Sequence, residues 1–522
     1  MKNPFSAGDA IDKKVGAEVV SPDPDVDIHH QPLDATNKSR WERLWPVMAC
    51  GSGLFSDGFL NNIIGSVSTI LAMIYPDEYA NSPAASNVSS IAFAGTVVGM
   101  LVFGYTSDLS RKWSLVISTV ILFVFAALAA GSYGAGGSVG GMLAALTAYR
   151  FFIGIGIGGE YPAGSVACAE ATGELKSGTR NRWFVLFTNN MIDIGFVVSA
   201  FVPMVVVLAT TEKHLRAAWR ICLGLGIIPP LSLIYLRLKL NEPEAFKREK
   251  MTKAKTPWLL VIKFYWFRLT IVSLIWFIYD FSAYSFGIYS STITANLLGE
   301  DYPLWKSFGW NTVINLFYLP GSISGAFVSD WLGPKKTLAY GVTAQAIVGF
   351  ILAGCYGQLY KPEYVGGFVV VYGIFLALGE LGPGDNIGLI ASKTCATPIR
   401  GKYYGIAAAT GKIGAYVGTK VLGILYSKYS TSDPVKAGQL PVYISSALCV
   451  VSALLAWFLL PHIGQDTIDY EDVKFRTYLA DNGYDVSQMG ERDDITREVS
   501  SSRHGSSEGE AVDVVGGRSE KY

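Results

Sequence analysis

Residues 269–288 read LTIVSLIWFIYDFSAYSFGI, an almost uninterrupted apolar run. A helix rises 1.5 Å per residue, so a run of this length is long enough to cross the hydrocarbon core of a bilayer. Trp276, Asp280 and Tyr284 follow one another at intervals of four residues. That spacing places an indole, a carboxylate and a phenol on one face of the predicted membrane helix.

The carboxylate in this run is the informative residue. An ionisable side chain at bilayer depth costs about 2.5–3.5 kcal/mol on insertion scales, so such residues usually serve binding or ion movement. Asp280 therefore indicates a binding face directed into a central cavity, or else a structural pair with a neighbouring helix. The functional interpretation requires partners for Asp280 elsewhere in the chain.

Apolar runs of similar length recur along most of the 522 residues, of which half are hydrophobic and only 16% are charged. This composition predicts an all-α integral membrane protein rather than several soluble domains. We expect twelve transmembrane helices, at 45–73, 88–107, 113–133, 139–165, 183–209, 217–237, 265–292, 308–330, 337–357, 365–392, 402–427 and 439–461.

Other classes of protein find little support in the sequence. The net charge is zero, so no nucleic-acid partner is indicated. The six cysteines are scattered without a CxxC pair, and the five histidines lie mostly in tails and loops. We therefore expect no enzyme active site, no catalytic residues, no cofactor and no metal site.

The predicted spans divide into two groups of six. We expect an N-terminal tail at 1–40, a first half at 41–237, a central loop at 238–263, a second half at 264–461 and a C-terminal tail at 462–522. The central loop is rich in lysine and arginine, so it is predicted to be cytoplasmic, and the even number of spans then places both tails in the cytoplasm. The two tails are polar and are predicted to be solvated.

The two halves repeat one another. Asp108 follows the second span and precedes Arg111 and Lys112, and Asp330 ends the eighth span and precedes Lys335. An aspartate at a helix end with cations nearby can form a breakable cytoplasmic gate, or the cations can be topological anchors only. The recurrence at the same place in both halves favours a duplicated, pseudo-symmetric transporter.

These features resemble the major facilitator superfamily. The fourth span contains RFFIGIGIGGEYP at 150–162 and the eleventh contains GKIG at 411–414. With Asp57 and the face at 276–284, they resemble the phosphate:H⁺ symporter branch, and within it the yeast glycerophosphodiester permeases, which import glycerophosphoinositol and glycerophosphocholine. The resemblance extends over about 41–482, and the motifs of spans four, seven and eleven together are specific to it.

Proton coupling is the role that the resemblance implies for the buried acids. Asp57 lies within the first span, and Glu160 ends the glycine run of the fourth. Burial in a medium of low dielectric constant favours the neutral carboxyl, so Asp57, Glu160 and Asp280 are predicted to bind and release protons. For Glu160 the alternative is a salt bridge to a cation of the cytoplasmic gate.

Lys412 is the cation that the predicted cavity requires, because it lies inside span eleven. It is expected to pair with Asp280 in the empty site and with a substrate phosphate in the loaded site; a permanent structural pair is the alternative. Neutral donors to the phosphate would come from Tyr161, Trp276 and Tyr284. The symporters place a glutamine near Asn189 and Asn190 in span five, so both are weaker candidates for the substrate site.

Span ten departs from the symporter pattern. The phosphate symporters have Gly-Pro-Asn where this chain has Gly382-Pro383-Gly384-Asp385. The missing asparagine disfavours inorganic phosphate and predicts open space at Gly384 for a group attached to the phosphate. Asp385 is predicted to contact that head group, or else to cap a helix broken at Pro383.

We therefore expect a proton-coupled symporter that imports glycerophosphodiesters across the plasma membrane by alternating access. The partners would be a small phosphodiester, protons and the lipid bilayer, and the protein is expected to be a monomer. The alternatives are an inorganic phosphate:H⁺ symporter and a nutrient sensor that does not transport.

Overall fold

The computed structural model describes residues 40–251, 255–299, 302–429, 432–465, 467–486 and 489. The tail predicted at 1–40 lies outside the described residues except for Arg40, and so does the predicted C-terminal tail beyond residue 489. Among the described residues, those from Leu44 onward belong to one compact unit, and residues 40–43 belong to a separate one. Apart from these first residues of helix α2, everything that follows concerns the larger unit.

All regular elements of the described chain are helices. The first half contains α2 (Arg40–Gly51), α3 (Phe55–Ile74), α4 (Pro83–Ser107), α5 (Arg111–Ala130), α6 (Val139–Gly159), α7 (Val166–Ala171), α8 (Arg180–Phe187), α9 (Asn189–Thr210), α10 (Leu215–Leu225) and α11 (Ile228–Leu238). The remainder contains α12 (Glu244–Glu249), α13 (Trp258–Leu298), α14 (Leu304–Leu316), α15 (Tyr318–Trp331), α16 (Pro334–Leu359), α17 (Val365–Gly379), α18 (Asp385–Lys393), α19 (Arg400–Tyr429), α20 (Pro434–Leu459) and α21 (Thr467–Asp481).

Every predicted span falls on one of these helices or on two consecutive ones. Eleven helical segments in the described chain are long and apolar enough to cross a membrane. The twelfth span is α19, whose 30 residues give it ample length. Its hydropathy is lowered by Lys412 and Lys420, which lie within the helix.

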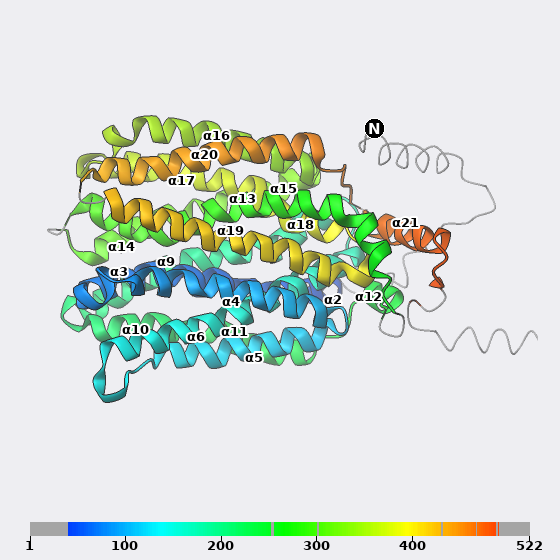
Figure 1. Ribbon diagram of the computed structural model, residues 1–522, viewed down its shortest axis with the longest axis horizontal. Coiled ribbons are helices and arrows are strands. Elements are labelled where there is room, and N and C mark those ends of the chain that lie inside the picture. The colour runs from blue at the N-terminus through cyan, green and yellow to red at the C-terminus, as the bar shows by residue number, and fades with distance from the viewer. Residues whose placement is uncertain are drawn as a thin grey trace, which may run out of the picture. The chain divides into compact units, whose positions relative to one another are not determined.

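Four main pairs of helices join the two halves. In Figure 1 the long helices run side by side, and α4 lies next to α19 near the middle of the bundle. The other main pairs are α3 with α13, α9 with α14 and α8 with α15. Residues that face this interface therefore come from both halves, which is where a transporter built of two repeats places its substrate site.

Two helices in equivalent positions of the two halves are interrupted by a π-helical turn. The first turn, Glu160–Ser165, joins α6 to α7, and the second, Glu380–Gly384, joins α17 to α18. Such turns shift the register of a helix and are frequent at functional sites. Here they carry Tyr161 and Asp385 towards the interface between the halves.

The segments predicted to be cytoplasmic are more structured than the sequence predicted. Helix α13 begins at Trp258, inside the expected central loop, and α12 forms within that loop. Helix α21 begins the segment predicted as a solvated tail, and it lies near α12 at one end of the bundle in Figure 1. Its Phe475 and Leu479 are buried, and the Phe475 ring lies 6.0 Å from the ring of Phe264 in α13. An apolar face on α21 thus holds this helix against the transmembrane bundle.

Candidate functional site

Lys412 is buried in the middle of α19, between the two halves. Its Nζ lies 3.3 Å from Oδ2 of Asp280 in α13 and 3.8 Å from Oδ2 of Asp57 in α3. The ammonium also lies 3.5 Å from the centre of the Tyr284 ring and 4.8 Å from that of Tyr161, both within the range of a cation–π contact. The structure therefore brings together five residues that the sequence predicted for one site, and we call them the lysine cluster.

Asp57 is fixed chiefly by neutral donors. The hydroxyl groups of Tyr161 and Tyr284 both donate to its Oδ2, Tyr284 at 2.9 Å, and the amide of Asn61 donates to Oδ1 at 2.5 Å. The two tyrosine hydroxyls lie 3.0 Å apart. A carboxylate, an ammonium and two phenols thus share one buried network, in which a change of protonation at Asp57 alters every contact.

The ammonium of Lys412 has unused donors. Although it lies close to two carboxylates, its Nζ makes no hydrogen bond of acceptable geometry with the described part of the protein. An ammonium carries three N–H donors, and a buried donor without an acceptor is costly. The lysine cluster can therefore accept an anionic ligand more readily than a pair with ideal geometry could.

Glycines on α19 set the position of Lys412. A Cβ atom at Gly414 would lie 2.2 Å from the carbonyl oxygen of Phe277, and one at Gly411 would lie 2.5 Å from the indole of Trp276. Only glycine permits such an approach between membrane helices. The motif at 411–414 thus packs α19 against α13 and directs Lys412 to Asp280.

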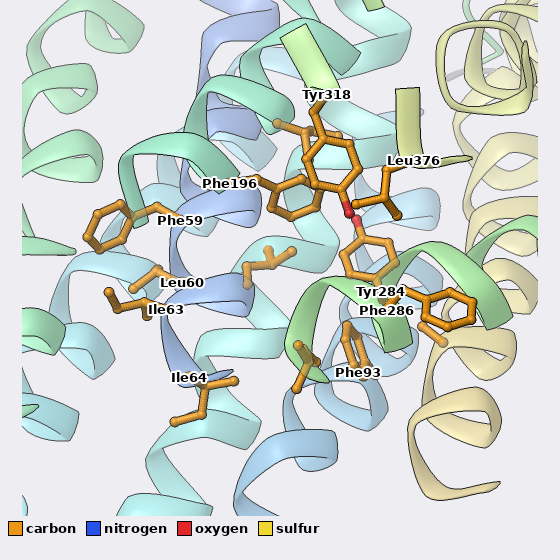
Figure 2. Close-up of a cluster of buried hydrophobic side chains, with 14 of the residues drawn as sticks. Phe59, Leu60, Ile63, Ile64, Phe93, Phe196, Tyr284, Phe286, Tyr318 and Leu376 are labelled. Carbon is orange, nitrogen blue, oxygen red and sulfur yellow. The ribbon is translucent and has the colours of Figure 1, made fainter. Parts of the chain in front are cut away.

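Aromatic side chains enclose the lysine cluster on its outer side. Figure 2 shows Tyr284 surrounded by Phe93 of α4, Phe196 of α9 and Tyr318 of α15. The Tyr284 ring is edge-on to Phe93 at 5.2 Å and to Phe196 at 5.9 Å between ring centres. These contacts exclude water from the cluster and strengthen the electrostatic interactions within it.

A cavity of about 40 Å³ lies beside the lysine cluster, which is room for a few water molecules. A larger ligand therefore requires the helices to move apart. The predicted site residues that line this cavity are Tyr161, Asn189, Trp276, Asp280, Tyr284 and Asp385. Lys412 and Asp57 do not line it but contact residues that do. Asn190 is elsewhere, because its Oδ1 accepts a hydrogen bond from Ser322 at 2.9 Å.

The other end of the cavity is acidic. Asp193 of α9 and Glu380 and Asp385 of span ten are all buried and line the cavity, and we call these three residues the acidic cluster. The amide of Asn189 donates to Glu380 and to Asp385 at 2.9 Å each and is 3.4 Å from Asp193. The Tyr279 hydroxyl lies 2.8 and 2.9 Å from the two carboxyl oxygens of Glu380.

Sequence reasoning missed Glu380 and gave Asp193 no role. A signal for Glu380 is present, because Gly379-Glu380 with Pro383 repeats the pattern of Gly159-Glu160 with Pro162 in the other half. The predicted open space at Gly384 is wrong. A Cβ there would lie 2.1 Å from Oε2 of Glu380 and 2.7 Å from the Tyr279 hydroxyl, so these two side chains fill the space that glycine leaves.

Glu160 is held apart from the lysine cluster. Its carboxylate receives two hydrogen bonds from Arg237, at 2.6 and 2.5 Å, and one from Ser118 at 2.8 Å. Both charged side chains are fully buried. This bidentate geometry is the strongest that a carboxylate forms with arginine. A salt bridge does hold this residue, but its partner is Arg237 at the end of span six and not a cation of the predicted gate.

The predicted gate around Asp108 connects the halves. Asp108 pairs with Arg111 at 2.9 Å within its own half. It also accepts hydrogen bonds from the backbone of Gly401 at 2.8 Å and Lys402 at 3.1 Å, at the start of α19. A carboxylate at a helix N-terminus is stabilised by the helix dipole. Glu170 adds a second link, because it pairs with Arg111 at 2.9 Å and Arg400 at 3.0 Å.

The counterpart in the second half uses different partners from those expected. Asp330 pairs with Arg182 of α8 at 3.3 Å and accepts a hydrogen bond from the Arg182 backbone. Lys335 instead donates to the carbonyl of Leu460 at 2.5 Å. In the first half, Lys112 forms no ion pair with the described residues, and its backbone N–H donates to Glu242. Each aspartate therefore lies at the start of a helix in the opposite half.

Helix α21 adds a contact at the end of the bundle that is predicted to be cytoplasmic. Asp472 accepts hydrogen bonds from the backbone and the hydroxyl of Thr397, at 2.5 and 2.6 Å, and lies 3.8 Å from Arg400. Burial raises the pKa of Asp472 to about 6, against the opposing effect of Arg400. The C-terminal helix is thus joined to the loop that precedes α19.

Comparison with known proteins places this geometry in context. The sequence profile of the sugar (and other) transporter family matches residues 45–256 and again residues 244–474. The chain is 54% identical over 462 residues to the "Major glycerophosphoinositol permease GIT3" of Candida albicans, covering 87% of this chain and 85% of that protein. It is 48% identical over 505 residues to the "Glycerophosphocholine permease GIT4" of the same organism, covering 95% and 92%.

More distant matches agree in fold. The "Inorganic phosphate transporter PT2" of Toxoplasma gondii is 26% identical over 433 residues, covering 81% of this chain and 73% of that protein. Among solved structures, the major facilitator proton:xylose symporter XylE matches with a TM-score of 0.69 over 83% of this chain and 98% of that chain. At 18% identity this likeness shows the fold alone. The prediction of twelve helices in two six-helix halves is confirmed.

Proposed function

Because the chain belongs to the sugar (and other) transporter family of the major facilitator superfamily, we propose that it imports glycerophosphodiesters together with protons across the plasma membrane. The observation that carries this proposal is the lysine cluster beside a cavity between the halves, in a chain 54% identical to a glycerophosphoinositol permease. The cluster supplies a cation for a phosphodiester and acids for protons.

The phosphodiester binds through Lys412 and the hydroxyl groups of the two tyrosines. A phosphodiester carries one negative charge, and an ammonium with unused N–H donors is a suitable partner for it. Tyr161 and Tyr284 supply neutral donors once Asp57 no longer holds them both. Asp280 competes with the substrate for Lys412, because its Oδ2 lies 3.3 Å from Nζ.

This competition couples the substrate to protons. When Asp57 and Asp280 take up protons, their attraction for the ammonium weakens, and Lys412 can bind the phosphodiester. When the protons leave, the two carboxylates attract the ammonium again and the substrate is released. We assign coupling to Asp57 and Asp280, and we assign Glu160 a structural role, because Arg237 holds its carboxylate in a bidentate pair.

Alternating access requires the cytoplasmic contacts between the halves to break and re-form. The bonds from Gly401 and Lys402 to Asp108, and the pair between Arg182 and Asp330, join opposite halves. They form the cytoplasmic gate of the proposal. The lysine and arginine residues in the loops at this end support a cytoplasmic location for both chain termini. An epitope tag at either terminus that is accessible from outside intact cells would contradict this orientation.

The experiment that tests the function is uptake by cells that lack their own phosphodiester and phosphate carriers. Labelled glycerophosphoinositol, glycerophosphocholine and inorganic phosphate are supplied in turn, each with the others as competitors. We expect uptake of a diester that rises as the external pH falls and collapses with a protonophore. Uptake of phosphate without uptake of either diester would refute the proposal, and so would diester uptake that ignores pH and the protonophore.

A further inference from the structure

The acidic cluster has more acceptors than its donors can satisfy. The amide nitrogen of Asn189 lies within 3.4 Å of carboxyl oxygens of all three acids. A side-chain amide has only two N–H donors. The Tyr279 hydroxyl contributes one more, and it is directed to Glu380 alone.

Two of the carboxyl oxygens are buried without any hydrogen bond. Oδ1 of Asp193 and Oδ2 of Asp385 have no partner in the described protein, and both residues line the cavity. No described lysine or arginine forms an ion pair with Asp193, Glu380 or Asp385, whereas the described acids in the lysine cluster and at Glu160 do have cations. Buried carboxylates are normally paired, so this end of the cavity is suited to a ligand that brings its own positive charge.

The surroundings favour an organic cation over a metal ion. No group of histidine, cysteine or acidic side chains among the described residues has an arrangement that could hold a metal ion. The same cavity is lined by the aromatic residues Phe184, Phe196, Trp276 and Tyr279. Aromatic faces attract organic ammonium groups, including quaternary ones.

We propose that the acidic cluster binds the ammonium head group of a zwitterionic glycerophosphodiester while the lysine cluster holds its phosphate. This inference rests on the transport function proposed above and narrows its substrate class. A neutral polyol head group could donate hydrogen bonds to the unpartnered oxygens, but it would bring no positive charge to balance a carboxylate that ionises there. The site is therefore selective for a cationic head group.

The two ends of the cavity are close enough for one ligand. Tyr279 donates to Glu380 of the acidic cluster, and its neighbour in sequence, Asp280, lies 3.3 Å from Lys412. Consecutive residues of one helix thus contact both clusters. A two-carbon bridge separates the phosphate from the ammonium in glycerophosphocholine and glycerophosphoethanolamine, so such a ligand can reach both clusters.

The test is equilibrium binding to the purified full-length protein. Three ligands are compared, glycerophosphocholine, glycerophosphoethanolamine and glycerophosphoinositol, on the wild type and on Glu380→Gln and Asp385→Asn. These changes remove a charge and keep the shape. We expect each variant to bind the two zwitterionic diesters at least about tenfold more weakly and to change the affinity for glycerophosphoinositol by less than about twofold. Asp77→Asn, which neutralises an exposed acid, is the matched control and should match the wild type.

The outcomes separate this inference from the function on which it rests. If the wild type binds none of the three diesters, the proposed function fails. If the wild type binds them but the variants weaken all three equally, or weaken none, the assignment of the ammonium site is overturned, and the acids serve only as proton carriers or as structural groups. Should one variant fail to fold, Asp193→Asn replaces it in the same comparison.

Discussion

Glu160 and Glu380 occupy equivalent places in the two halves, and their environments differ. Both follow a glycine, precede a proline by two or three residues and begin a π-helical turn. Glu160 is locked by two hydrogen bonds from Arg237. Among the described residues, Glu380 has only the neutral donors Asn189 and Tyr279. The same local structure thus holds a permanently paired carboxylate in one half and a carboxylate beside the cavity in the other.

The difference shows how one local structure, present in both halves, can serve stability in one half and ligand or proton binding in the other. A buried pair with good geometry is satisfied, and removing one partner is costly because the other charge remains unpaired. A carboxylate with neutral partners can instead change its protonation or its ligand. With the neutral partners Asn189 and Tyr279, Glu380 can therefore bind a proton or a ligand. The ion pair with Arg237 instead gives Glu160 a structural role.

The largest effect is expected when Glu160 loses its cation and so has only neutral partners, as Glu380 has. Arg237→Met removes the only charged partner that Glu160 has in the described structure. We expect a loss of about 3–5 kcal/mol in stability, because a buried carboxylate loses its counter-ion. Thermal unfolding of the purified protein measures it. The double variant Arg237→Met with Glu160→Gln should recover most of the loss, and no recovery would show that Arg237 acts through packing.

The reverse exchange gives Glu380 a fixed cation. Asn189→Lys places an ammonium near the carboxyl groups that now lie 2.9 Å from the amide. We expect a folded protein whose uptake of zwitterionic diesters falls at least about tenfold, because the introduced charge occupies the acidic cluster. Uptake of labelled glycerophosphocholine measures it, with Asn189→Gln as the uncharged control. Normal uptake by the lysine variant would contradict a role for the cluster in transport.

A smaller change tests the contact at Gly384. In Gly384→Ala the new Cβ would lie 2.1 Å from Oε2 of Glu380, so the carboxylate must move away from Tyr279. We expect a loss of about 1–3 kcal/mol, as for other overpacked sites, measured by thermal unfolding. The double variant Gly384→Ala with Glu380→Ala shortens the side chain at position 380, so it should relieve the contact between that side chain and the new Cβ. A single variant as stable as the wild type would show that Glu380 has room to move.

The smallest effect concerns Asp472, a buried acid outside the membrane whose partners are a hydroxyl, a backbone amide and a more distant arginine. Its pKa is raised from 3.8 to about 6 in the docked helix. A raised pKa means that the docked form binds the proton more tightly. Protonation of Asp472 therefore stabilises the docked form of α21. This stabilisation is fully present below pH 3.8 and is lost as the pH rises through about 6.

Hydrogen exchange of the α21 amides, corrected for the intrinsic effect of pH, measures this change. Protection should be greater at pH 5 than at pH 7 in the wild type, and the difference should disappear in Asp472→Asn. Equal protection in the wild type at both values would mean that Asp472 does not titrate in this range.

Much of the fold followed from the sequence because the signal for a membrane helix is local. Asp57, Asp280 and Lys412 were found for the same reason, since a charge within an apolar run is conspicuous in the sequence. The partners were harder to identify. Arg237 ends span six, so the sequence made it appear to be the first cation of the basic loop, although it is buried against Glu160.

Residues whose role depends on the facing helix could not be assigned. Asn189 and Asn190 are adjacent in sequence, and only the packing of α9 shows that the first faces the acids and the second faces Ser322. The missing side chain at Gly384 suggested open space. The side chain of Glu380, one helical turn earlier, occupies that space instead. In both cases the deciding contact is between side chains whose directions depend on tertiary structure.

The most direct test of the account is accumulation of glycerophosphocholine by the purified protein in proteoliposomes with an imposed proton gradient. Wild type and Lys412→Gln are compared with and without the gradient, at equal protein content. The wild type is predicted to accumulate the diester above its external concentration only when the lumen is more alkaline than the outside, and Lys412→Gln is predicted not to accumulate it at all. Accumulation by the variant at the wild-type level, or uptake by the wild type that is the same without a gradient, would contradict the exchange of Lys412 between its carboxylates and the substrate.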